Sequence, residues 1–140
     1  MRKNNNRNIA LLLVIIFIVG CIFTILYYYN YYLLDHLQVR TDVTVTEGGA
    51  AFNVNDENLS MGKTVRGGSA ERSFHISNKQ KSLVKVSAAG NISPYLTFSD
   101  NNFILPANEV KQIFVYFIAP ENISLGKYHG VINVNFYRAK

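Results

Sequence analysis

The sequence predicts an all-β domain, an antiparallel β-sandwich, preceded by one N-terminal transmembrane helix. Three observations predict this architecture. Residues 9–34 form an apolar stretch without a charged side chain. From residue 37 onward, apolar residues recur at every second position, which is the period of a half-buried strand. Clusters of Gly, Asn, Asp and Pro separate these segments, as turns do, and none of them has the 3.6-residue period of an amphipathic helix.

The composition sets the size of the domain and its class of partner. The chain has 140 residues, so residues 35–140 suffice for one domain with a single core. The net charge is +5, and Arg2, Lys3 and Arg7 supply three of these charges. The later basic residues are spread singly and nearly balanced by acids. A nucleic-acid-binding domain gathers its Lys and Arg on one element, so we expect no nucleic-acid partner.

Residues 9–34 are predicted to anchor the chain in a lipid bilayer. At about 1.5 Å per residue, a helix over residues 9–29 matches a hydrocarbon core of roughly 30 Å. One end carries the interfacial tyrosines Tyr27, Tyr28, Tyr29, Tyr31 and Tyr32. Residues 1–8 hold three positive charges and no acid. The positive-inside rule then predicts a single-pass protein of the cell membrane, with residues 1–8 in the cytoplasm and residues 35–140 outside.

The same stretch has three interpretations: an uncleaved signal anchor, a cleaved secretory signal and a lipoprotein signal. A cleaved signal has a shorter apolar region and a small-residue cleavage site, which is missing before Asp35. Residues 18–21, Ile-Val-Gly-Cys, resemble a lipobox and make Cys21 a candidate lipidation site. The chain stays apolar for a dozen residues beyond it, where a lipoprotein has a polar tether. The signal anchor fits best.

The domain after the anchor is predicted to consist of seven to nine short strands. In residues 37–45, Val39 and Val43 alternate with Arg40 and Asp42. Similar segments follow at 51–54, 59–65, 72–77, 83–88, 95–99, 102–105, 110–118 and 127–137. Many short strands with turns between them are typical of an antiparallel sandwich.

Three motifs of this domain resemble the immunoglobulin-like domains of prokaryotic surface proteins. Residues 74–78, Phe-His-Ile-Ser-Asn, resemble their F-x-[IL]-x-N strand and turn. Residues 103–117 resemble the next hairpin, and residues 120–132 resemble the closing P…G-x-Y-x-G-x-I strand. The pattern covers residues 61–138. The resemblance implies an immunoglobulin-like β-sandwich, of the kind that occurs in adhesins, S-layer-associated proteins, enzyme accessory modules and appendage subunits.

The chain departs from the antibody type of this fold, because it lacks the cysteine pair and the core tryptophan. Its one cysteine, Cys21, lies in the apolar stretch, so no intrachain disulfide is possible. Gly126 and Tyr128 have the spacing of a tyrosine corner, in which the phenol hydroxyl closes a loop between two strands.

No catalytic residue, cofactor, metal site or small-molecule substrate is predicted. Within residues 61–64, Met-Gly-Lys-Thr, the last three match the Gly-Lys-Thr end of the phosphate-binding motif G-x-x-x-x-G-K-[ST]. Position 57, where this motif has its first Gly, is Glu. A zinc site needs three or four converging ligands. His36 lies beside the membrane, while His75 and His129 alternate with core positions. The G-x-S-x-G turn of a nucleophilic serine is missing too.

Three asparagines lie in N-x-[ST] sequons near predicted turns. These candidate N-glycosylation sites are Asn58, Asn91 and Asn122. Turns at the surface are accessible to a glycan, and the predicted topology places all three outside the cell.

The outward side of residues 113–118 is unusually apolar. When Ile113, Val115 and Phe117 face the core, the other side carries Phe114, Tyr116 and Ile118. A sandwich strand normally shows polar residues outward. Either another strand or the N-terminal extension covers this side, or it is a surface for a protein partner.

These observations predict a single-pass, membrane-tethered binding or scaffolding module at the cell surface, without catalytic activity. The alternative is an accessory subunit of a larger membrane or surface-appendage complex whose activity lies in another chain. In both cases the bilayer contact is made by residues 9–34, and the partner at the cell surface is a protein.

Overall fold

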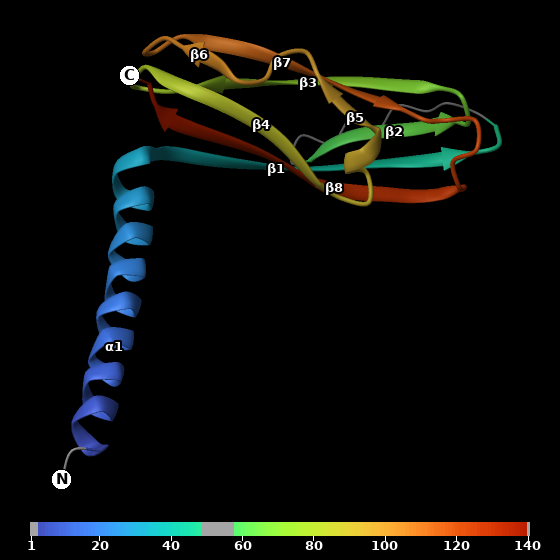
Figure 1. Cartoon of the computed structure of the whole chain (residues 1–140). Helices are drawn as coiled ribbons and strands as arrows, with labels where there is room; N and C mark the ends of the chain where they lie inside the picture. Colours follow the sequence, from blue (N-terminus) through green and yellow to red (C-terminus); the bar gives the residue numbers. More distant parts are fainter. Residues whose placement is uncertain (1–2, 49–57, 140) are drawn as a thin grey trace.

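A computed structural model describes residues 3–48 and 58–139, without the side chains of residues 3–8, 30 and 31. Helix α1 (Lys3–Tyr27) leads through a π-helical turn (Tyr28–Tyr32) into a mostly-β domain of two sheets (Figure 1). The part of α1 that is apolar and long enough to cross a membrane is Ile9–Tyr27. The helix ends where Leu33 takes an extended backbone, at φ −87° and ψ 113°. The last two residues of the predicted anchor therefore lie in a strand.

The larger sheet has five strands and curves into a half-barrel. Its order is β2 (Leu59–Val65), β1 (Leu33–Thr46), β8 (Gly126–Arg138), β4 (Ser82–Gly90) and β6 (Phe103–Leu105). The pairs β1–β8, β8–β4 and β4–β6 are antiparallel.

The prediction of a purely antiparallel arrangement is wrong for one pair, because β1 and β2 are parallel. Parallel neighbours need a connection of a dozen residues or more. Residues 47–58 provide that length between Thr46 and Leu59. The strand predicted at residues 51–54 lies outside the described residues.

The smaller sheet has three antiparallel strands in the order β3 (Ser69–Ser77), β7 (Val110–Ile118) and β5 (Leu96–Phe98). The predicted strands 59–65 and 110–118 coincide with β2 and β7, and the other described strands differ at their ends by up to four residues. The core lies between the two sheets. Ile113, Val115 and Phe117 are fully buried on the inward side of β7, as their alternation predicts.

The predicted tyrosine corner is confirmed. The Tyr128 hydroxyl donates a hydrogen bond of 2.8 Å to the Ser124 carbonyl, four residues earlier, and closes the turn that leads from β7 into β8. Its ring packs edge-on against Tyr95, with 5.5 Å between centroids, and lies 6.3 Å from Phe117. The corner therefore joins the two sheets at the end of the domain opposite the helix.

Two glycines allow β4 and β8 to approach closely. Gly90 and Gly130 are cross-strand partners. Gly90 has φ +102°, and a Cβ on Gly130 would collide with the Ala89 carbonyl oxygen and the Ile92 side chain. A side chain at either position would push the strands apart, so this pair sets the curvature of the larger sheet.

Candidate partner-binding face and the membrane junction

The outward side of β7 carries the residues that the alternation singled out. Ile118 is 54% exposed, and Phe114 and Tyr116 are partly exposed. Val110, at the other end of the strand, is 64% exposed and continues the same side. We call Val110, Phe114, Tyr116 and Ile118 the β7 ridge.

The neighbours of the ridge are small or polar. On β3, Ser73 lies opposite Phe114 and Glu71 lies opposite Tyr116. On the other flank, Thr97 of β5 is the partner of Tyr116. Serine and threonine are short, and both aromatic rings remain partly exposed.

The described elements leave the ridge uncovered. Figure 1 shows α1 leaving the domain on the side of β1, whereas β3 and β7 lie on the side away from the helix. Among residues 3–48 and 58–139, no further strand or helix lies over the small sheet. Within residues 3–48 and 58–139, Phe114 and Tyr116 are partly exposed, and the surface for a protein partner stays a prediction.

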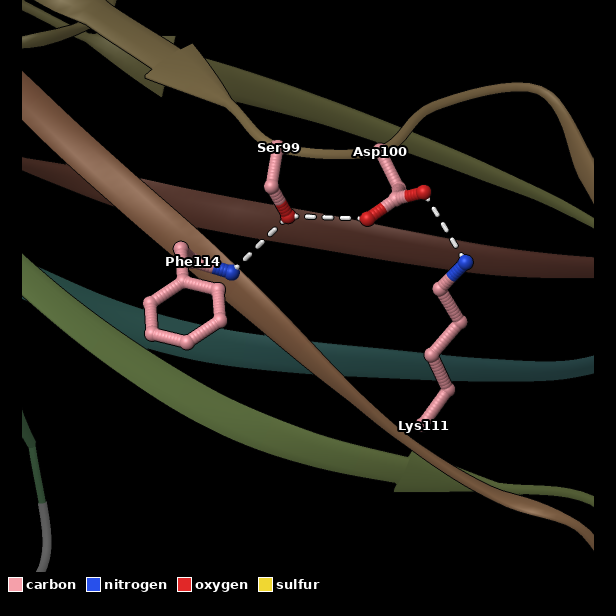
Figure 2. A network of polar contacts seen from close by, with 4 residues as sticks. All are labelled: Ser99, Asp100, Lys111 and Phe114. Atoms are coloured by element: carbon pink, nitrogen blue, oxygen red, sulfur yellow. Dashed lines mark hydrogen bonds and ion pairs between the residues drawn. The ribbon is translucent and has the colours of Figure 1, made fainter.

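A polar network supports β7 just beyond the end of β5 (Figure 2). The Ser99 hydroxyl accepts a hydrogen bond of 3.1 Å from the Phe114 N–H and donates one of 2.9 Å to Asp100. The Ser99 N–H donates to the Phe114 carbonyl at 3.0 Å. Ser99 thus satisfies both the N–H and the C=O of Phe114 on the side of β7 that faces β5. These bonds fix the backbone in the middle of the ridge.

Asp100 extends the network to β7 itself. Its other carboxylate oxygen accepts a 2.9 Å hydrogen bond from Lys111 Nζ. This bond first, and then the one from Ser99, holds the pKa of Asp100 below its ordinary value. The Lys111 ammonium also lies 4.3 Å from the ring centroid of Phe103 on β6, so the network links the two sheets.

A second cluster joins the helix to the domain. The Tyr32 ring stacks on Tyr28, at 5.6 Å between centroids, and lies 5.7 Å from Tyr137 near the end of β8. Burial, and then a hydrogen bond with Tyr28, raise the pKa of Tyr137. Lys85 Nζ on β4 lies 5.5 Å from the centroid of Tyr137. We call Tyr28, Tyr32, Tyr137 and Lys85 the junction cluster.

Sequence reasoning missed both polar features. The tyrosines after the helix were recognised, but Tyr137 is more than a hundred residues away and only the β1–β8 pairing brings it to them. Asp100 and Asn101 lie between the predicted strands 95–99 and 102–105, and the sequence indicates no role for their side chains. In the structure the Asn101 side chain also accepts a hydrogen bond of 2.8 Å from the Val86 N–H.

The candidate modification sites lie apart from the ridge. Asn58 precedes β2, Asn91 follows β4, and Asn122 lies in the turn before β8; all three are exposed. The Asn91 side-chain oxygen accepts a 2.7 Å hydrogen bond from the His129 N–H. Cys21 is an exposed free cysteine in the apolar part of α1.

The three histidines lie on different strands: His36 on β1, His75 on β3 and His129 on β8. Within the described part of the chain, no group of three or more His, Cys, Asp or Glu side chains has the spacing to hold a metal ion.

Comparisons of the chain with protein-family models, with curated proteins and with solved structures gave no match. The structure itself defines the class: one N-terminal apolar helix followed by a β domain of two packed sheets.

Proposed function

We propose that this chain is a single-pass, membrane-tethered binding or scaffolding module at the cell surface, built on an immunoglobulin-like β-sandwich and without catalytic activity. Two features support the topology. Ile9–Tyr27 has the length and composition of a membrane span. The three positive charges of residues 1–8 favour a cytoplasmic N-terminus. The two packed sheets and the tyrosine corner support the immunoglobulin-like layout.

The observation that carries the binding role is the β7 ridge. Two aromatic rings and two aliphatic side chains line one strand, and Ile118 and Val110 are more than half exposed. Phe114, Tyr116 and Ile118 are successive outward residues, and Gln112 separates them from Val110. Apolar side chains gathered on a surface mark an interaction site, and aromatic residues contribute much of the energy at protein interfaces. The ridge fits an apolar groove or a flat sheet on a protein partner.

Tethering supplies the mechanism. The helix passes into β1 through a five-residue turn, so the domain stays next to the membrane. A tether of this length raises the effective concentration of the ridge toward a partner in the same membrane. The ridge lies on the side of the domain away from the helix, which leaves it accessible to such a partner (Figure 1).

One feature favours the alternative of an accessory subunit in a larger membrane or surface-appendage complex. The apolar side of β7 includes both of its ends, Val110 and Ile118, rather than a central anchor alone. Permanent interfaces are larger and more apolar than transient ones. Solubilisation in mild detergent separates the two roles, because a permanent complex keeps its mass whereas a transient partner dissociates.

The binding role is tested by crosslinking in native membranes followed by mass spectrometry. The full chain carrying Phe114→Ser and Tyr116→Ser should lose its crosslinked partner and keep its melting temperature. The matched control is Ile104→Ser, which removes a 49% exposed side chain from the other sheet and should keep the partner. A partner retained by the double variant contradicts the proposal, and collapse of the fold would show that the two rings are core residues.

The topology is tested by protease treatment of intact cells. Cleavage of residues 35–140 from outside is the expected result. Protection in intact cells, with cleavage only after permeabilisation, would show that the orientation is reversed.

A further inference from the structure

The junction cluster determines how close the outward side of the five-stranded sheet lies to the bilayer. When α1 spans a bilayer, as in the proposed function on which this inference rests, its apolar part ends at Tyr27. The turn Tyr28–Tyr32 then lies among the lipid headgroups, where tyrosine is favoured. Tyr137 touches Tyr32 and bonds to Tyr28, so it lies at the same depth.

Tyr137 belongs to the outward side of the five-stranded sheet. Its neighbour Phe136 is 2% exposed and points into the core, so Tyr137 points the other way. The same side carries Lys85 on β4, opposite Asn135, and Arg40 on β1, opposite Val131. The outward side of the larger sheet thus begins at the headgroups and continues along β1, β8 and β4.

The charge of this side is mainly positive. Its exposed basic residues include Arg40, Lys85 and Lys127, which we call the basic face. Lys63 at the β2 edge of the sheet, opposite Thr44, is exposed on the same side. His36 and His129 share the side, and Asp42 is the acid that lies among them, opposite His129. The corresponding side of the smaller sheet instead carries Glu71 beside the apolar ridge.

The domain lies sideways on its helix. Figure 1 shows the strands running across the direction of α1, with β1 and β8 on the side toward the helix. Strands that continued the helix direction would carry the far end of the sheet away from the membrane. With the observed geometry, the whole length of β1 and β8 runs over the membrane surface.

We propose that the outward side of the five-stranded sheet rests on an anionic lipid surface, with Arg40, Lys85 and Lys127 binding phospholipid phosphates. A basic residue near an anionic leaflet strengthens attachment by about fivefold, so the three together contribute roughly 100-fold. Tyr137 adds an interfacial contact at the start of the face. This attachment turns the β7 ridge away from the bilayer and toward a partner.

The test uses the full chain with Cys21→Ser, reconstituted in vesicles that contain a nitroxide-labelled headgroup lipid. A fluorophore is attached to one new cysteine at a time. Gln38→Cys and Gln112→Cys form a matched pair, because both glutamines are exposed and lie on the outward sides of the larger and the smaller sheet. Tyr29→Cys reports whether the turn after α1 lies at the level of the lipid headgroups, as the anchor requires.

With about a third of the lipid anionic, the label at Gln38 should be quenched at least threefold more than the label at Gln112. Half-molar salt, or the triple change Arg40→Gln, Lys85→Gln and Lys127→Gln, should reduce the difference, because screened or missing charges no longer bind the face to the lipid. An unchanged difference would overturn the role of the three basic residues. Equal quenching of both labels, with Tyr29 still quenched, overturns the lipid-facing surface and leaves the anchor intact. An unquenched label at Tyr29 overturns the anchor itself.

Discussion

The two outward faces of the domain differ in character although they enclose one core. On β7 the outward positions include Phe114, Tyr116 and Ile118, with Gln112 as the polar one, whereas on β8 they include Asn133, Asn135 and His129. The inward positions in the middle of both strands are apolar and buried: Ile113, Val115 and Phe117 on β7, and Ile132, Val134 and Phe136 on β8. The core therefore requires alternating apolar residues from each strand. The outward positions are free of this requirement, so their chemistry depends on what each face contacts.

This difference explains the orientation that we infer for the molecule. Exposed apolar side chains are an aggregation hazard, and the β7 ridge therefore supports the protein partner that we propose for the smaller sheet. A basic, polar sheet suits a lipid headgroup surface instead. The helix joins the polar face through Tyr137 and leaves the apolar face on the far side. Four substitutions test this comparison, from the largest expected effect to the smallest.

Phe117→Ala should have the largest effect, a loss of about 3–5 kcal/mol in the free energy of unfolding, since Phe117 is fully buried between the sheets. Phe114→Ala, three residues away on the outward side, should lose much less, because part of its ring already meets solvent. Denaturant unfolding of the full chain in detergent, followed by circular dichroism, measures both. Equal losses would show that the ridge belongs to the core.

Gly130→Ala should destabilise the larger sheet by about 1–3 kcal/mol, because its new methyl group meets the Ala89 carbonyl oxygen. The control is Gly48→Ala, where a Cβ has no heavy atom within 4 Å and where we expect a change within about 0.5 kcal/mol. The same denaturation measurement applies. A neutral Gly130→Ala would mean that the curvature of β4 and β8 does not depend on this glycine pair.

Much of this fold was predictable because its signals are local. The apolar stretch, the alternation of β7 and the tyrosine corner each depend on residues that lie close in the sequence. The parallel pairing of β1 with β2 was not predicted, because turn residues at 47–49 and 55–58 suggested a return by hairpins. The alternation of apolar and polar residues shows which side of a strand is buried, but it does not show which strands pair with it.

The candidate functional surfaces also divide into one that the sequence predicts and one that it does not. The period of a single strand predicts that Phe114, Tyr116 and Ile118 share the outward side of β7 and that the other side is buried, whereas Val110 was added to the ridge from the structure. The basic face was not predicted, since Arg40, Lys85 and Lys127 come from three separate strands and look evenly scattered in the sequence. Sheet pairing gathers them on one side. A surface built from several strands is thus invisible until their register is known.

Tyr137→Phe should loosen the junction without unfolding the core, because it removes the hydrogen bond to Tyr28, worth about 0.5–1.5 kcal/mol. Burial, with that bond, raises the pKa of Tyr137 above its ordinary value of 10.0. The folded state then holds this proton more tightly than the unfolded chain. Its contribution to stability is complete below pH 10 and is lost as the pH rises through the raised value.

Alkaline denaturation of the wild-type chain and of Tyr137→Phe measures this contribution. The variant should show a shallower loss of stability above pH 10, because it lacks the titrating hydroxyl. Tyr116→Phe, on the other face, should follow the wild-type curve. If both variants behave alike, the junction cluster does not couple the helix to β8.

Asp100→Asn should have the smallest effect, confined to acid pH. Hydrogen bonds from Lys111 and Ser99 lower the pKa of this carboxyl in the folded state, so their contribution is present above the ordinary value of 3.8 and is lost as the pH falls through the lowered value. Asp100→Asn and Lys111→Met should each flatten the acid limb of a pH–stability curve.

The double variant Asp100→Asn with Lys111→Met should flatten the acid limb no further than either single variant. The reason is that each change removes the same interaction between these two side chains. Additive effects would show that the two side chains act separately. Since the Asp100–Lys111 pair is partly exposed, its main role is positional: it holds Ser99, which in turn holds the backbone of Phe114. Ser99→Ala should therefore weaken capture of the partner by the ridge more than it lowers stability. The basic face, which shares no residue with this network, should keep its contact with lipid.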